Sequence, residues 1–239
     1  MKFKSITILI PTYNEEKTIK QTIDSVKKAN TLKLKKQIII IDDGSTDNTQ
    51  KKIKSLKYRS LLLLAHTTNR GKGAALRTGF KKATGDIIII QDADLEYDPS
   101  DYPSLLQPIL DGKADCVYGS RFINHKPHRI LYFWHQVGNT IITLFSNALT
   151  NLNLTDMETG YKVFTREVIK KIHPKLNSNR FGFEPEVTAQ IAKLAKREDI
   201  KIYEVGISYY GRTYKEGKKI TWKDGILALW YIVKYNIFS

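Results

Sequence analysis

Short apolar runs recur through the first half of the chain, at Ile6–Ile10, Ile38–Ile41, Ile87–Ile90 and, more weakly, Cys116–Tyr118. Continuous apolar runs of this length are typical of strands buried on both faces of a parallel sheet. Stretches with helical periodicity separate the runs. Alternation of strand and helix favours right-handed βαβ units, so the pattern predicts an α/β fold with a mostly parallel sheet flanked by helices.

Two helices are predicted between these strands. Asn14 is expected to cap a helix that runs to Ala29 and carries an apolar stripe of Ile19, Ile23 and Val26. A second helix is expected after Gly73, with its apolar positions at Leu76, Phe80 and Ala83.

The second half of the chain has a less regular pattern. Ile130–Leu154 is a long aromatic and aliphatic stretch, and Glu184–Arg197 has helical spacing. Ile200–Tyr210 is predicted to be a strand, and Trp222–Phe238 an aromatic-rich helix. No repeat or linker divides the chain, so we expect a single domain over residues 1–239, with residues 1–122 and 123–239 as its two halves.

Acidic clusters directly follow two of the predicted strands. Asp42-Asp43-Gly44-Ser45 comes after the Ile38–Ile41 run, and Gln91-Asp92-Ala93-Asp94 after the Ile87–Ile90 run. In open parallel sheets, ligands bind beyond the carboxyl ends of the strands. We therefore expect both clusters, together with the Pro11–Glu15 turn, to meet at one edge of the sheet.

Asp92 and Asp94 are candidate metal ligands, and Glu96 is a third. Carboxylate oxygens suit Mg²⁺ or Mn²⁺, and such an ion can also bind a diphosphate. The alternative is a solvated acidic loop, which does not explain why the motif follows a buried strand and shares an edge with a second acidic pair.

Two further motifs suggest nucleotide binding. Asp42 and Asp43 can accept hydrogen bonds from a base or a ribose, although a turn that caps the next helix through Asp47 is the simpler alternative. Asn69–Leu76 places two glycines and a lysine at a helix start, where an anion is favoured. Its spacing does not match a Walker motif, and an ordinary glycine-rich entry to a helix remains open.

The bulk composition narrows the list of partners. The 239 residues are 41% hydrophobic and carry a formal charge of +15, which suits nucleic acid, an anionic membrane or phosphate-rich substrates. Cys116 is the only cysteine, so no internal disulfide is possible, which is compatible with the cytosol. No signal peptide is recognised, and no apolar run reaches the roughly 20 residues of a membrane span, so a soluble or peripheral protein is expected.

Taken together, these motifs resemble the family 2 glycosyltransferases, which have the Rossmann-like GT-A fold. The Pro11–Glu15 turn, Asp42–Asp47, Asn69–Leu76 and Asp92–Glu96 match the fold. The branch that includes dolichol-phosphate mannose synthase and bacterial polyprenyl-phosphate glycosyltransferases is indicated by a second set: Gly119-Ser120-Arg121, Asp156, Thr159-Gly160-Tyr161-Lys162, Arg212 and Lys218.

The resemblance implies a role for each matching residue. Residues that would hold the nucleotide sugar are Pro11, Tyr13, Glu15, Ile41, Asp43, Asp92 and Ala93. Metal ligands would be Asp92, Asp94 and Glu96, and catalytic or phosphate-binding residues would be Asp94, Arg121, Arg212 and Lys218. The synthases of this branch usually have Gln at the position of Glu96, so Glu96 would add a charge to the metal site or bind the sugar instead.

The implied activity is inverting transfer of a hexose, mannose or glucose, from a GDP- or UDP-sugar to a polyprenyl phosphate. A phosphate monoester is already ionised near pH 7 and needs no strong base. Transfer to the hydroxyl of a sugar or glycolipid is the main alternative, and it needs a base such as Glu184 or Glu186. Both acids can instead complement the helix dipole.

The aromatic segments Ile130–Leu154 and Trp222–Phe238 belong either to the core or to a bilayer interface. With the basic charge, they predict a cytoplasmic protein on the cytoplasmic face of a membrane, with an anionic lipid surface as a partner. The tail can also contact another subunit or a membrane protein. No nucleic-acid-binding motif is recognised, so nucleic acid is not an expected partner. An inactive nucleotide-sugar sensor is the least favoured alternative.

Overall fold

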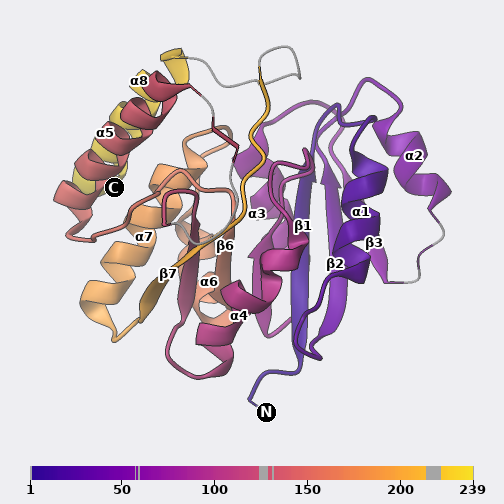
Figure 1. Ribbon diagram of the computed structural model, residues 1–239, viewed down its shortest axis with the longest axis horizontal. Coiled ribbons are helices and arrows are strands. Elements are labelled where there is room, and N and C mark those ends of the chain that lie inside the picture. Colours follow the sequence, from indigo (N-terminus) through magenta and orange to yellow (C-terminus); the bar gives the residue numbers. More distant parts are fainter. Residues whose placement is uncertain are drawn as a thin grey trace.

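The computed structural model describes residues 2–56, 58, 60–123, 129–130, 132–213 and 222–238, without the side chains of Trp222 and Lys223. A seven-stranded sheet in the order β3-β2-β1-β4-β6-β5-β7 lies between layers of helices (Figure 1). Neighbouring strands are parallel except at β6, which is antiparallel to both β4 and β5. The strands are β1 Ser5–Thr12, β2 Lys35–Asp42, β3 Leu61–Ala65, β4 Ile87–Ile90, β5 Cys116–Ser120, β6 Lys162–Thr165 and β7 Ile202–Gly206.

Helices cover both faces of this sheet. The helices are α1 Ile19–Lys28, α2 Thr49–Ser55, α3 Lys72–Lys82, α4 Tyr102–Leu110, α5 Phe133–Thr150, α6 Arg166–Ile172, α7 Phe183–Arg197 and α8 Trp222–Ile237, with 3-10 turns at Pro99–Asp101 and His173–Lys175. Helices α1, α2 and α4 pack in one core cluster, and α3, α6 and α7 in the other. Helices α5 and α8 lie side by side and pack against α7 (Figure 1). The predicted mixed, mostly parallel α/β architecture is confirmed.

The isoleucine runs are continuous because each central strand is buried on both faces. Ile8 and Ile10 of β1 belong to the cluster under α1 and α4, whereas Leu9 between them belongs to the cluster under α3 and α7. Ile40 and Ile41 of β2 divide between the two clusters in the same way. Successive side chains of a strand point to opposite faces, so both must be apolar.

The predicted helix cap at Asn14 is wrong. Asn14 has a left-handed φ of 52°, and α1 begins only at Ile19. Its side-chain oxygen accepts a hydrogen bond from the Thr46 amide at 2.8 Å, so it joins the β1–α1 turn to the β2–α2 loop instead. Asp47 does satisfy a helix-start amide as expected, because its carboxylate accepts from the Thr49 amide at 2.9 Å.

Three predicted helices are confirmed with small shifts in their ends, namely α3, α7 and α8. The strand expected over Ile200–Tyr210 is shorter and ends at Gly206. Strands β3 and β6 were not predicted. The antiparallel β6 begins at the edge where β4 and β5 end, so the Thr159–Tyr161 segment before it reaches the predicted ligand-binding edge.

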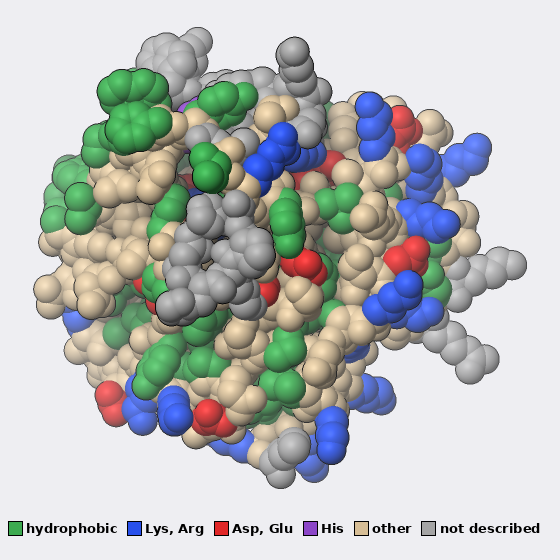
Figure 2. Space-filling view, viewed as in Figure 1, with side chains coloured by type: hydrophobic (Ala, Val, Ile, Leu, Met, Phe, Trp, Pro, Cys, Tyr) green, Lys and Arg blue, Asp and Glu red, His purple; other side chains and the backbone are tan. Residues whose placement is uncertain are grey.

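Helices α5 and α8 expose many large apolar side chains. Figure 2 shows hydrophobic side chains gathered over the corner of the molecule that these helices form. Exposed apolar residues are Phe133, Trp134, Ile141, Leu144 and Phe145 on α5, and Ile226, Leu227, Trp230 and Ile237 on α8. These side chains are therefore not core residues. Among the described residues, no helix is both long and apolar enough to cross a membrane.

Candidate active site

The acidic motif after β4 lies beside a segment from the far end of the chain. Tyr97 and Tyr209 form an isolated antiparallel bridge, and the Tyr210 amide donates to the Glu96 carbonyl at 2.9 Å. The Tyr209 hydroxyl donates to the Glu96 carboxylate at 2.9 Å. This pairing carries the residue that follows, Arg212, to the end of β4.

Arg212 contacts three carboxylates at this edge. Its guanidinium lies 3.1 Å from Asp94 and 3.6 Å from Glu15, and its backbone amide donates to Glu96 at 2.8 Å. Although burial disfavours its charge, these acids raise the pKa of Arg212 above its usual value. The structure thus brings Arg212 together with Asp94 and Glu96, two of the predicted metal ligands.

Asp94 carries an excess of negative charge. Burial and the neighbouring Asp92 and Glu96 together raise the pKa of this carboxyl to about 7, against the opposing effect of Arg212. Hard carboxylate oxygens suit Mg²⁺ or Mn²⁺, and a divalent cation would relieve this crowding. Within the described ranges no cluster of three or more acids, histidines or cysteines is already arranged around a common metal position. The three carboxylates fit a divalent cation by their chemistry, while Arg212 and Lys72 neutralise them in this conformation.

Lys72, the first residue of α3, connects the acidic motif after β4 with the start of α7. Its ammonium lies 3.0 Å from Asp92 and 3.0 Å from Glu184, at the start of α7. Although burial disfavours the charge, the two carboxylates raise the pKa of Lys72 well above its usual value. Lys72 lies at the predicted anion-binding helix start, but its pairing with Glu184 could not be predicted from the sequence.

Asp43 holds the loop that precedes α3. Its carboxylate accepts hydrogen bonds from the amides of Arg70 at 3.0 Å and Gly71 at 2.6 Å. The His66 ring contacts the same carboxylate at 2.6 Å and the Thr78 hydroxyl at 3.0 Å. Gly71 has a φ of 97°, which a residue with a side chain rarely adopts. Asp43 therefore positions the backbone beside the predicted nucleotide site.

The other residues predicted to hold the nucleotide differ in what they present. Pro11 and Tyr13 are partly exposed at the end of β1. Glu15 is 9% exposed and accepts a hydrogen bond from the Thr18 hydroxyl at 2.9 Å. The side chain of Ile41 is wholly buried in the core, so only its main chain can contact a nucleoside.

Ala93 and Gly160 both make close backbone contacts near the acidic motif. The Ala93 carbonyl accepts from the Thr22 hydroxyl at 3.0 Å. A Cβ added at Gly160 would lie 2.2 Å from Asp92 Oδ2, so a larger residue would displace the Asp92 side chain. The Gly160 amide donates to the Tyr97 hydroxyl at 2.8 Å, which joins the segment before β6 to the end of β4.

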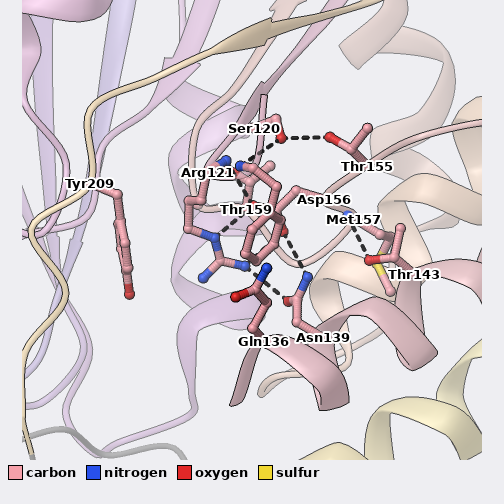
Figure 3. A network of polar contacts seen from close by, with 12 residues as sticks. Ser120, Arg121, Gln136, Asn139, Thr143, Thr155, Asp156, Met157, Thr159 and Tyr209 are labelled. Carbon is pink, nitrogen blue, oxygen red and sulfur yellow. Dashed lines mark hydrogen bonds and ion pairs between the residues drawn. The ribbon is translucent and has the colours of Figure 1, made fainter. Parts of the chain in front are cut away.

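Arg121 is bound in a planar fork to Asp156 (Figure 3). Its Nε lies 2.6 Å and its Nη2 2.7 Å from the two carboxylate oxygens, and Nη2 also donates to Asn139 of α5 at 3.0 Å. The guanidinium carbon lies 5.2 Å from the centre of the Tyr209 ring. Although burial disfavours its charge, Asp156 raises the pKa of Arg121 well above its usual value. Tyr209 therefore contacts Arg121 through its ring and shares Glu96 with Arg212, while the predicted Lys218 lies outside the described residues.

Glu186, the second candidate base, supports a loop instead. Its carboxylate is fully buried and accepts from the amides of Asn177 at 2.7 Å and Ser178 at 2.8 Å. Glu184 is 5% exposed and bound to Lys72, as described above. Both oxygens of Glu186 therefore accept hydrogen bonds, whereas Glu184 Oε2 has no hydrogen-bond partner among the described residues.

Residues 7–173 match the sequence profile of glycosyl transferase family 2. The chain belongs to this family of glycosyltransferases. A relative that is 32% identical over 224 residues, covering 87% of this chain and 86% of its own length, is the UDP-N-acetylglucosamine–dolichyl-phosphate N-acetylglucosaminyltransferase of Methanococcus voltae. The undecaprenyl-phosphate mannosyltransferase of Micrococcus luteus is 28% identical over 89% of this glycosyltransferase and 86% of its own chain.

Solved structures support the GT-A fold of this glycosyltransferase. Glucosyl-3-phosphoglycerate synthase from Mycobacterium tuberculosis, in complex with Mn²⁺ and UDP, superposes with a TM-score of 0.73 at 19% identity. The match covers 99% of this chain and 80% of the synthase. At this identity the likeness establishes the fold, and the predicted fold class is confirmed.

Proposed function

We propose that this glycosyltransferase moves a sugar from a nucleotide sugar to a polyprenyl phosphate, with inversion at the anomeric carbon. The observation that carries the proposal is the meeting of the acidic motif with Arg212, on a segment whose Tyr209 ring contacts Arg121. This arrangement brings one guanidinium group next to carboxylates suited to a metal–diphosphate and a second against the same segment. Relatives named for dolichyl- and undecaprenyl-phosphate acceptors support the same acceptor class.

The donor is proposed to lie over the ends of β1, β2 and β4. Pro11, Tyr13 and Glu15 would face the nucleoside, with the main chain of Ile41, while Asp43 would fix the loop before α3 and contribute to the base site. Asp92 and Ala93 would hold the ribose and diphosphate. Bound Mg²⁺ or Mn²⁺, held by Asp92, Asp94 and Glu96, would supply positive charge for the leaving diphosphate.

The contacts of the two described acids at the start of α7 also support a phosphate acceptor. Glu184 is paired with Lys72, and Glu186 accepts two backbone amides. A sugar hydroxyl needs a base to remove its proton, whereas an ionised phosphate does not. In the proposed reaction an oxygen of the lipid phosphate forms a bond to the anomeric carbon, and the bond from that carbon to the diphosphate oxygen breaks.

Arg121 and Arg212 are proposed to hold the two anionic substrates together. A guanidinium can bind phosphate through two parallel hydrogen bonds, and close positioning of two anions is the main demand of this reaction. Arg121 is fixed by Asp156, and Arg212 faces Asp94. Lys218, outside the described residues, remains a predicted third phosphate ligand.

The site is proposed to work at a membrane surface on the cytoplasmic side. Helices α5 and α8 expose aromatic and aliphatic side chains, such as Trp134 and Trp230, that suit a bilayer interface. Asn139 of α5 contacts Arg121, so the exposed apolar helix is directly linked to the acceptor side of the site. A lipid-linked phosphate can reach the site from this side.

A donor panel tests the proposal. The purified protein is incubated with GDP-mannose, UDP-glucose or UDP-N-acetylglucosamine, Mn²⁺ and a short polyprenyl phosphate, with the matched polyprenol as the control acceptor. We expect sugar transfer from one of these donors to the phosphate and none to the alcohol. Transfer to the alcohol, or to a free sugar at an equal rate, would contradict the lipid-phosphate assignment.

A further inference from the structure

A polar cavity lined by residues outside the acidic motif lies between the loop before α3, the loop before α7 and the last turns of α8. Its volume is about 510 Å³. We call it the basic pocket. It is lined by Asn69, Arg70, Asn177, Ser178, Asn179, Arg180, Tyr231, Lys234 and Tyr235. Asn69 and Arg70 belong to the loop before α3 that Asp43 holds beside the predicted nucleotide site, and the other lining residues are outside the set proposed to bind donor, metal or acceptor.

The wall of the basic pocket is held in place by buried contacts. Glu186 accepts the amides of Asn177 and Ser178, and Arg77 donates to the Ser178 carbonyl and to the Asn179 side chain. A Cβ added at Gly73 would lie 2.4 Å from the Ser178 carbonyl oxygen, so α3 and this loop are in direct contact. The pocket is therefore formed before any ligand arrives.

The side chains that line the basic pocket suit a phosphate group. Arg70, Arg180 and Lys234 supply positive charge, and among the described residues none of the three forms an ion pair. The Ser178 hydroxyl, on a residue 6% exposed, lies beside the Tyr235 hydroxyl. Burial raises the pKa of Tyr235 against the opposing effect of Ser178, so the Tyr235 hydroxyl stays neutral. Guanidinium and hydroxyl donors around a fixed cavity are typical of phosphate recognition.

The exposed face of α8 indicates what carries the phosphate. Leu227, Trp230 and Ile237 are 49%, 55% and 60% exposed. Lys234 lies on the same stripe, four residues after Trp230 and three before Ile237. The pocket therefore opens next to a surface that suits acyl chains, with a lysine where the two meet. A soluble phosphate compound has no acyl chain that could contact this apolar surface.

We propose that the basic pocket binds the phosphate headgroup of an anionic membrane lipid, separately from the acceptor site. The proposal extends the membrane-surface part of the proposed function. Engagement at the pocket would hold α8 against the bilayer, and through the packing of α8 on α5 it would orient the acceptor side of the site toward the lipid phase.

Vesicle binding in the absence of nucleotide sugar tests the pocket apart from transfer. The double variant Arg180→Gln/Lys234→Gln is compared with Lys28→Gln/Lys51→Gln, which removes the same charge from exposed positions on α1 and α2. Vesicles contain phosphatidylcholine alone or an equal mixture with phosphatidylglycerol. We expect the pocket variant to lose at least about tenfold in affinity for the anionic vesicles and the control variant about twofold or less. Equal losses would overturn the proposal.

Arg180→Lys separates a shaped site from diffuse attraction. This variant keeps the charge but lacks the fork of donors, so a shaped phosphate site predicts weaker binding to anionic vesicles. Unchanged binding would indicate diffuse attraction and would overturn the proposal.

Glycerol 3-phosphate, titrated in solution, distinguishes the source of the phosphate. Pocket-dependent binding of glycerol 3-phosphate with vesicle binding unaffected by the pocket variants would assign the pocket to a soluble ligand and contradict the lipid assignment. If neither the wild type nor any variant transfers sugar, but vesicle binding still depends on the pocket, the result counts against the proposed function alone.

Discussion

The carboxylates at the ends of β2 and β4 occupy corresponding places in the sheet but have opposite surroundings. Asp43, after β2, accepts hydrogen bonds from two backbone amides and contacts His66. Asp94, after β4, lies among like charges and has a pKa raised to about 7, first by burial and then by Asp92 and Glu96. Its cationic partner Arg212 comes from a segment 118 residues away.

This difference separates a carboxylate that shapes the protein from one arranged for a ligand. A buried carboxylate with hydrogen-bonded partners fixes the backbone that donates to it. Acidic groups crowded together oppose folding, and such crowding is typical of functional sites where an incoming cation compensates the charge. Substitution of Asp43 should therefore lower stability more than substitution of Asp94 does, and substitution of Asp94 should lower activity more than stability.

Asp94→Asn should give the largest loss of activity. Removal of this charge deprives the proposed metal–diphosphate of a ligand, so transfer should fall by at least about 10²–10³-fold, the scale for a lost electrostatic contact in the transition state. The melting temperature should stay constant or rise, because one of several crowded charges is gone. Asp199→Asn, on an exposed residue, is the control. Full activity in the variant, or in wild-type protein with EDTA, would remove the metal from the account.

Arg212→Ala should come next, with transfer reduced by about 10²-fold through loss of a bidentate phosphate contact. Free nucleotide should bind with a much smaller change, which calorimetry can measure. Arg212→Lys should recover little of the rate, because an ammonium cannot reproduce the fork. Arg197→Ala, on the exposed end of α7, controls for lost charge. A wild-type rate for Arg212→Ala would exclude Arg212 from phosphate binding.

Asp43→Asn should lower both stability and nucleotide affinity, each by about 1–3 kcal/mol, the scale for disrupting hydrogen bonds to a charged buried group. The nitrogen of the new side-chain amide would face the Arg70 and Gly71 amides, which now donate hydrogen bonds to the carboxylate. Thermal unfolding and nucleotide titration measure the two effects. Reduced nucleotide affinity with unchanged stability would show that Asp43 acts on the base alone, which would break the contrast with Asp94.

Glu184→Gln should have the smallest effect, a decrease in transfer of less than about tenfold. The variant keeps a hydrogen-bond acceptor for Lys72 but loses the ion pair that helps to position Asp92. A general base contributes about 10²–10⁴-fold, so a loss on that scale would identify Glu184 as a base and favour a sugar hydroxyl as the acceptor.

The strand ends that carry these carboxylates could be predicted from the sequence. The isoleucine runs are continuous because helices cover both faces of the central strands. Each acidic cluster directly follows such a run, so it lies at the carboxyl end of a parallel strand. Strand β3 gave a weaker signal, since it lies at the margin of the sheet and Leu62 is 39% exposed. Strand β6 was missed because it begins with Lys162, whose ammonium is buried against the Met157 and Thr159 carbonyls.

The partners of the site residues could not be predicted in the same way. Lys72 and Glu184 meet because α3 and α7 start at the same edge, which depends on the order of strands across β6. The bridge between Tyr97 and Tyr209 likewise sets which carboxylates Arg212 reaches. Local patterns define the elements and their ends, but tertiary topology decides which charges pair.

Direct identification of the bond formed is the measurement that tests the central claim most closely. The protein is incubated with the active nucleotide sugar, Mn²⁺ and a short polyprenyl phosphate, and the lipid product is analysed by mass spectrometry and phosphorus NMR. The account predicts conversion of the lipid phosphate monoester into a sugar phosphodiester with inverted anomeric configuration, and no conversion with Asp94→Asn. A sugar attached to a hydroxyl, with the lipid phosphate unchanged, would contradict it.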